Sequence, residues 1–285
     1  MIRMNFRNDW KGFLEKEMIS YGLQYDQVES LEDNTLRYLN AKRRTPRCTP
    51  RTVHESKELQ IPPQHIVDYS HLKKLMQEGG NLGPYLSRDI QKGQADKNDP
   101  LLNTWGIQHL HFRSHPGTLD VLLVRITDTD VFVIQSFPHG RGHADTWVNS
   151  ELLEIVHNNN WPEMELGEVK GVAAEPLTSN AKVSLRKRNV NFATATSDGT
   201  VYIAPGGGVT SSGRCFFDVC EKDKIFSELD SWQRWVEGHE DNFRTALGIS
   251  ASEDLSIKMM FGDQECWLYD PVRNKRFAIT LAASK

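Results

Sequence analysis

The stretch WGIQHLHFR, residues 105–113, marks the point where the periodicity of the chain changes. From here on, apolar residues fall into short runs at 107–112, 119–126 and 131–137, rich in β-branched and aromatic side chains. Such runs between turn residues are typical of strands. The tight turn TDTD at 127–130 predicts that the second and third runs form a hairpin.

The first hundred residues have a helical pattern instead. Apolar positions recur at helical spacing over 10–18, 31–39 and 66–76, and the third segment ends at Gly79 and Gly80. Between the second and third segments, the stretch RRTPRCTPR at 43–51 predicts an extended connector, because proline has no backbone N–H to donate.

The last part of the chain mixes both patterns. We expect a helix from about residue 146 or 149, and a pair of strands around the Asp198-Gly199 turn. A long helix over about 222–247 and terminal strands at 255–261, 265–269 and 276–281 follow. The sequence therefore predicts an α+β fold: a helical region over 1–100, then a domain over 101–285 with a mainly antiparallel sheet, a long C-terminal helix and terminal strands.

Composition places limits on function. With 38% hydrophobic and 25% charged residues, the chain resembles ordinary globular proteins. The net charge of -4 gives no overall signature of nucleic-acid binding, so any basic surface must be local. No run approaches the roughly 18 apolar residues that span a bilayer. The four cysteines lack metal or disulfide spacing, so we expect reduced thiols in a cytoplasmic protein that does not contact membranes.

Five of the ten histidines fall between positions 109 and 143. His109 and His111 are two apart on an expected strand, so both side chains point to one face, and Leu110 and Phe112 point to the other, packed face. The pair can bind a metal with a third histidine and leave a position open for water. It can also act as general base and acid without metal. A third interpretation is a polar sheet face with hydrogen-bonded imidazoles.

The loop PHGRGHAD at 138–145 follows the third expected strand and carries His139, Arg141 and His143. Glycines at 140 and 142 let the backbone approach a ligand closely or adopt unusual dihedral angles. A guanidinium pairs with phosphate and stabilises charge that develops in a transition state. We interpret this loop as part of a site.

Two basic groups indicate a nucleic-acid ligand. Six cations and no acid lie between Asn34 and His54, and a second group surrounds residues 182–188. Positive side chains of this kind can follow a phosphate backbone. The candidate nucleic-acid-binding residues are Arg43, Arg44, Arg47, Arg51, Arg113, Arg186 and Arg188.

Two segments of the chain resemble known proteins. The strings NDPLLNTWGIQHLH at 98–111 and HNNNWP at 157–162 are similar to a family of uncharacterised bacterial and mobile-element proteins. The middle segment, with histidines and arginines on one sheet face, resembles metal-independent ribonucleases of the barnase/RelE type. That resemblance implies a helix before the sheet and RNA cleavage by scattered His, Arg, Lys and Glu side chains.

We therefore hypothesise an endoribonuclease, as a toxin or phage-defence effector, that needs no metal or other cofactor. RNA is the expected partner, together with a protein partner or inhibitor. His109 or His111 would be the base, His139 or His143 the acid, and Arg141 would stabilise the charge on phosphorus. The geometry this requires is that His111, His115, Arg141 and one of His139 and His143 line one cleft.

Two alternatives stay open. One is a metal-dependent nuclease or hydrolase that uses His109, His111 and a third ligand from His115, His139 or His143. The ELGEVK string at 165–170, with its carboxylates and lysine, is a further candidate for such a centre. The other alternative is a non-catalytic subunit of a mobile-element or defence system that binds nucleic acid or protein.

Overall fold

The computed structural model describes residues 2–114, 117–161, 167–262 and 265–277. The chain divides into two compact units, one of residues 1–20, 24–35 and 220–285 and the other of residues 21–23 and 36–219. The first unit thus joins segments from both halves of the chain, whereas the sequence suggested a boundary at residue 100. Among the described residues, no helix is long and apolar enough to cross a membrane.

The first unit is built around α1 (Phe6–Ser20), which buries four side chains at helical spacing: Phe6, Trp10, Leu14 and Met18. The ring of Trp10 lies 5.1 Å from that of Phe261, and the Asp9 carboxylate accepts a hydrogen bond from the Met259 N–H at 2.9 Å. These contacts fix α1 against a small antiparallel sheet.

The strands of this unit are short. The antiparallel sheet has the order β10 (Lys258–Phe261), β11 (Cys266–Asp270), β12 (Lys275–Phe277), and β1 (Ile2–Arg3) pairs in parallel with β9 (Leu255–Ser256). The helices are the first part of α2 (Leu31–Arg44), α8 (Phe216–Gly238) from Cys220 on, and α9 (Glu240–Leu247).

The second unit contains a four-stranded sheet in the order β2 (Thr52–Glu55), β5 (Asp130–Pro138), β4 (Asp120–Ile126), β3 (Gln108–His111). β3 and β5 are both antiparallel to β4, as the expected hairpin requires, and β2 is parallel to β5. β3 and β5 therefore end at the same edge of the sheet, where β4 begins. This edge positions the histidines.

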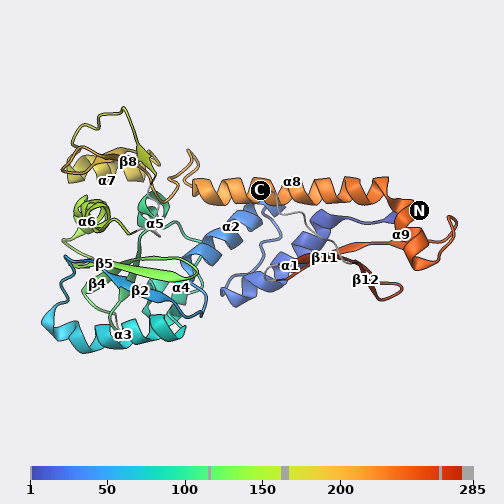
Figure 1. The fold of residues 1–285 in the computed structure, drawn as a ribbon, viewed down its shortest axis with the longest axis horizontal. Helices are drawn as coiled ribbons and strands as arrows, with labels where there is room; N and C mark the ends of the chain where they lie inside the picture. The colour runs from blue at the N-terminus through green and yellow to red at the C-terminus, as the bar shows by residue number, and fades with distance from the viewer. Residues whose placement is uncertain (1, 115–116, 162–166, 263–264, 278–285) are drawn as a thin grey trace. The chain divides into compact units, whose positions relative to one another are not determined.

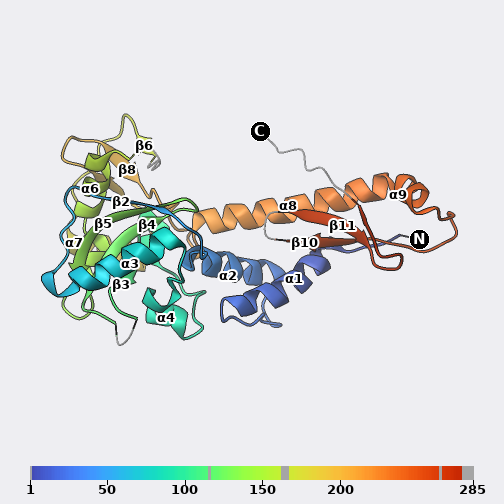
Figure 2. The same ribbon diagram turned by 60° about the horizontal axis from the view of Figure 1, so that its bottom comes forward.

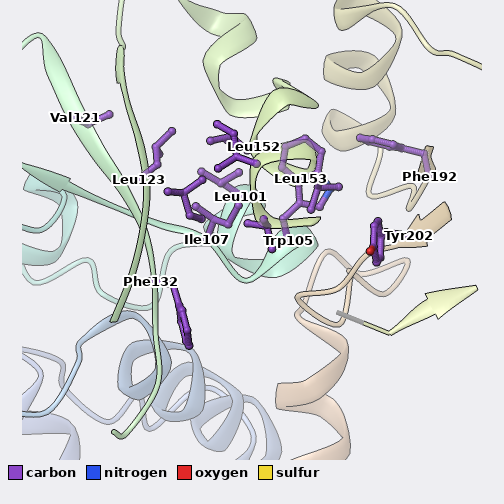
Figure 3. Packing of buried hydrophobic residues seen from close by; sticks show 13 residues of the cluster. Leu101, Trp105, Ile107, Val121, Leu123, Phe132, Leu152, Leu153, Phe192 and Tyr202 are labelled. Atoms are coloured by element: carbon purple, nitrogen blue, oxygen red, sulfur yellow. The ribbon is translucent and has the colours of Figure 1, made fainter. Parts of the chain in front are cut away.

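Both faces of this sheet are covered by helices (Figure 1; Figure 2). On one face, Leu110, Phe112 and Leu122 pack against Tyr69, Leu72 and Met76 of α3 (Ile66–Glu78). The other face packs against α5 (Pro100–Trp105) and α6 (Glu151–Asn159). Figure 3 shows the packing on this second face, with Leu101, Ile107 and Trp105 beside Leu152 and Leu153. His109 and His111 thus lie on a face that is also packed, not on an open polar surface.

Smaller elements complete the second unit. They are the 3-10 helices η1 (Pro63–His65), η2 (Gly83–Tyr85) and η3 (Ala144–Val148), helices α4 (Arg88–Gln91) and α7 (Ser179–Lys187), and a sheet in the order β6 (Glu168–Val169), β8 (Val201–Ile203), β7 (Ala193–Ala195). Gly106 ends α5 in the left-handed conformation with φ 71°. Its N–H donates to the carbonyl of Leu102, which is the usual role of glycine after a helix.

The predicted α+β class is confirmed, and the differences are local. Helix α2 continues to Arg44, so the extended connector begins after this residue, later than expected. The end of the connector leads into β2, a strand that the sequence did not predict. The expected long helix is two helices, α8 and α9, and the expected strand at 255–261 is the two strands β9 and β10. Residues 278–281 of the last expected strand lie outside the described residues.

Replacing Leu122 by alanine tests the packing of α3 on the sheet. Leu122 is fully buried, so Leu122→Ala is expected to lower the free energy of unfolding by roughly 2–5 kcal/mol. Leu119→Ala is the matched control, because that side chain is 62% exposed and its loss should change stability by less than about 0.5 kcal/mol. Urea denaturation of the two variants measures both. Equal effects would contradict this arrangement of the core.

Candidate active site

Three imidazoles meet where β3 and β5 end. The ring centroids of His111 and His139 are 5.0 Å apart, and His109 lies 5.9 Å from His111 and 6.2 Å from His139. The cause is strand order: β3 ends at His111 beside Val121, and β5 ends opposite Asp120, so that the chain after β5 returns to the start of β4. We call His109, His111 and His139 the histidine cluster.

Within the cluster, His111 is held as a neutral hydrogen-bond donor. Its Nδ1 accepts the backbone N–H of Thr118 at 3.2 Å, so the neutral ring carries its proton on Nε2. Burial, followed by the neighbouring imidazoles of His109 and His139, lowers the pKa of His111 to about 4. Gly117 lies against this ring. A Cβ at Gly117, where φ is +88°, would be 3.3 Å from Nδ1 of His111.

His139 is held in the opposite tautomer. Its Nδ1 lies 2.6 Å from the carbonyl oxygen of Leu119, which also accepts the backbone N–H of His139 at 2.9 Å. A carbonyl oxygen can only accept, so Nδ1 carries the proton and Nε2 has a free lone pair in the neutral ring. Two successive residues of the β3–β4 turn, Thr118 and Leu119, therefore give the two imidazoles opposite roles.

His109 connects the histidine cluster to a cavity. Its ring is half-buried and lies 5.0 Å from the ring of Trp147, and burial lowers its pKa. Within the described part of the chain, it makes no hydrogen bond to another residue. Its nitrogens are thus available to a ligand that enters the cavity, which His109 lines.

The cavity has a volume of about 440 Å³ and lies wholly within the second unit. Its walls come from α2, the segment before α5, η3 and α7. Cationic side chains are Arg44, Arg186 and Lys187, and the carboxylates are Asp89 and Asp99. The apolar wall consists of Leu101, Ala144, Trp147, Val148 and Val183. Sites for small organic ligands commonly have this size and mixture.

The loop after β5 carries the other predicted catalytic residues. Gly140 and Gly142 have φ of +95° and +91°, so the expected need for unusual dihedral angles is confirmed. Arg141 is exposed, and His143 is half-buried just before η3. Of the residues expected to line one cleft, His111 and His139 lie close together, and His109 joins them. The adjacent cavity is lined by His109 but not by His111, His139, Arg141 or His143, and His115 lies outside the described residues.

Arginines of the predicted basic groups have mostly structural partners. Arg43 pairs with Asp218, buried Arg51 donates to the carbonyl of Thr127, and exposed Arg113 pairs with Asp68. Arg47 and Arg188 are exposed, and Arg44 is only 4% exposed. Residues 43–51 therefore do not form the continuous exposed basic surface that the sequence indicated, because backbone carbonyls and a carboxylate take up several of the guanidinium groups.

In the part of the chain that the structure describes, no three His, Cys, Asp or Glu side chains are arranged to hold a metal ion. His111 accepts a backbone N–H through Nδ1, so its Nε2 carries the proton in the neutral ring, whereas His139 donates through Nδ1 and keeps the lone pair of Nε2. Of the ELGEVK string, Glu168 and Lys170 form an exposed ion pair of 3.0 Å, and Glu165 lies outside the described residues.

One polar constellation was not predicted from the sequence. His157 of α6 contacts the Tyr202 hydroxyl through Nδ1 at 2.7 Å and the Asp198 carboxylate through Nε2 at 2.9 Å. Burial raises the pKa of Tyr202. A buried tyrosine in its neutral form is a poor nucleophile, so we assign this constellation a structural role. Its hydrogen bonds join α6 to the β7–β8 hairpin. The HNNNWP string contains His157 but carries no signal for partners more than 40 residues away.

Comparisons of this chain with protein families, with curated proteins and with solved structures found no match. A function for the protein therefore has to be inferred from the geometry of the site.

The low pKa of His111 predicts a pH-dependent stability. Between pH 6.5 and 4, the unfolded chain takes up a proton at this imidazole that the folded chain does not, so the folded state loses stability as pH falls. Relative to His111→Gln, the wild type should lose roughly 3 kcal/mol of unfolding free energy at pH 4 and none above pH 7. Urea denaturation at several pH values measures this difference. His71→Gln is the control, because the His71 side chain is exposed on α3. Parallel curves for wild type and His111→Gln would contradict the buried neutral imidazole.

Proposed function

We propose that this protein is a metal-independent endoribonuclease whose chemistry is carried by the histidine cluster. The observation that carries the proposal is the pair of opposite tautomers: one imidazole with a free lone pair, His139, beside one that offers an N–H, His111. Their centroids are 5.0 Å apart. A proton acceptor and a hydrogen-bond donor at this separation are what the attack of a ribose 2′-hydroxyl on its neighbouring phosphate requires.

In the proposed reaction, Nε2 of His139 takes the proton of the 2′-hydroxyl, and the 2′ oxygen forms a bond to phosphorus. Nε2–H of His111 donates to a non-bridging phosphate oxygen, where negative charge increases. The bond from phosphorus to the 5′ oxygen breaks, and His143, four residues after His139, is assigned to protonate that leaving oxygen. Arg141 in the same loop provides positive charge. The products are a 2′,3′-cyclic phosphate and a 5′-hydroxyl.

The hydrogen bonds favour a different base from the one the sequence suggested. His109 and His111 were expected as bases, but Nδ1 of His111 already accepts the Thr118 N–H, and its Nε2 carries the proton in the neutral ring. His139 has the free lone pair because Leu119 accepts from its Nδ1. The proposed roles of the loop and the strand are therefore exchanged: the loop supplies the base, and the strand supplies a donor.

The two alternatives differ from this proposal in what they require. A metal-dependent hydrolase requires a third ligand beside His109 and His111, from His115, His139 or His143. Of these, His139 lies 6.2 and 5.0 Å from the two rings, and His115 lies outside the described residues. A non-catalytic binding protein requires only the cavity and its cations. RNA turnover measured with a chelator and again with an added divalent metal separates all three. The proposed enzyme cleaves RNA in both conditions, the metal-dependent enzyme cleaves it only with the metal, and the binding protein cleaves it in neither. A toxin or defence role is a further step that depends on this activity.

Cleavage of RNA in EDTA tests the proposal. Single-stranded RNA incubated with the full chain should be cut and should acquire 2′,3′-cyclic phosphate ends. His139→Ala is expected to lower the rate by about 10²–10⁴-fold, the usual contribution of a general base. His71→Ala is the matched control, because His71 is exposed on α3, which covers the opposite face of the sheet.

Three outcomes count against the proposal. RNA that stays intact at high protein concentration removes it. Cleavage that appears only when a divalent metal is added favours the metal-dependent alternative. Equal rates for His139→Ala and His71→Ala place the chemistry elsewhere in the molecule.

A further inference from the structure

The cavity beside the histidine cluster is lined by a largely buried guanidinium with incomplete hydrogen bonding, that of Arg186. Arg186 lies over the ring of Trp105 at 4.6 Å, and its Nη1 donates to the carbonyl of Trp147. Its Nε and Nη2 are buried and have no hydrogen-bond partner among the described residues. Burial lowers the pKa of Arg186 to about 10, and Asp99 is the carboxylate that acts in the opposite direction.

A second arginine that lines the same cavity, Arg44, also has incomplete hydrogen bonding. Arg44 is 4% exposed, and its Nη1 donates to the carbonyls of Gln94, Ala95 and Lys97. Its buried Nε has no hydrogen-bond partner in the part of the chain that the structure describes. Three carbonyl dipoles hold this guanidinium in place but do not neutralise its charge.

The two carboxylates that line the cavity, those of Asp89 and Asp99, have other partners. Oδ1 of Asp99 caps α5 by accepting the N–H groups of Leu101 and Leu102 at 3.2 and 3.1 Å. Asp89 pairs with Lys97 at 3.4 Å. The lining of the cavity contains the three cations Arg44, Arg186 and Lys187 against the two carboxylates, and this excess of positive charge suits an anion.

The remainder of the cavity is apolar and partly aromatic. Trp147 lines it together with Leu101, Val148 and Val183. The same indole lies 5.0 Å from the ring of His109 and 5.7 Å from that of His139. A flat ring against Trp147 would therefore be next to the imidazoles, and an anionic group on the same molecule would reach the arginines. Aromatic side chains commonly stack on the bases of single-stranded RNA.

We infer that this cavity binds one nucleotide of an RNA strand, with its phosphate on Arg186 and Lys187 and its base against Trp147. Arg44 adds positive charge from the wall of the cavity. As a statement about RNA, this rests on the proposed function. The binding itself does not require turnover, so it can be measured separately from cleavage.

Calorimetric titration of the full chain with the four 3′-nucleoside monophosphates tests the inference, with inorganic phosphate as a comparison. At least one nucleotide should bind more tightly than phosphate. Arg186→Gln and Trp147→Ala should each weaken binding about tenfold or more. Lys74→Gln, an exposed lysine on α3, removes the same charge away from the cavity and should have no effect. Arg186→Gln disturbs a buried group, so exposed Lys187→Gln provides the variant that keeps its fold and should weaken binding about threefold or more.

The outcomes separate this inference from the proposed function. Cleavage of RNA without binding of any nucleotide overturns the inference and leaves the proposed function in place. Nucleotide binding without cleavage supports the inference and overturns the proposal that the protein is a ribonuclease. Phosphate that binds as tightly as every nucleotide, or unchanged binding in both Lys187→Gln and Trp147→Ala, overturns the assignment of the cavity to a nucleotide.

Discussion

The candidate site depends on the antiparallel pairing of β4 with both of its neighbours. Because β3 and β5 flank the same strand, their ends meet at the start of β4, and residues almost thirty positions apart in the sequence come together there. The turn that begins β4 then offers one N–H, from Thr118, and one C=O, from Leu119, to two different imidazoles. A one-residue change of register would reverse the side-chain faces and separate these partners.

Burial on both faces of the sheet explains why these imidazoles differ from surface histidines. Packing of α5, α6 and η3 over their face removes water from His109 and His111 and favours their neutral forms. Neutral rings with fixed tautomers can share one small volume without mutual repulsion. The same packing forms the cavity walls, so the properties of the histidine cluster and of the cavity have a common origin.

Local patterns in the sequence were sufficient for the fold class, the three middle strands and the same-face placement of His109 and His111. They were insufficient for β2, because four residues with a single large aliphatic side chain carry no periodic signal and the strand forms only through its pairing with β5. The tautomers were equally out of reach, since the backbone groups that fix them come from a turn. Arginine composition indicated a basic surface over 43–51, but burial by distant segments turned Arg44 and Arg51 into supports for backbone carbonyls.

The composition of the two compact units has a consequence for how the chain folds as it is synthesised. Residues 36–219 form an almost continuous segment, so the unit that contains the histidines can assemble as soon as that segment has left the ribosome. Helix α1 is synthesised before β10, the strand against which it packs and which follows about 250 residues later. The apolar face of α1 therefore cannot pack against β10 until that strand has been synthesised, and contacts between residues so far apart in sequence form slowly.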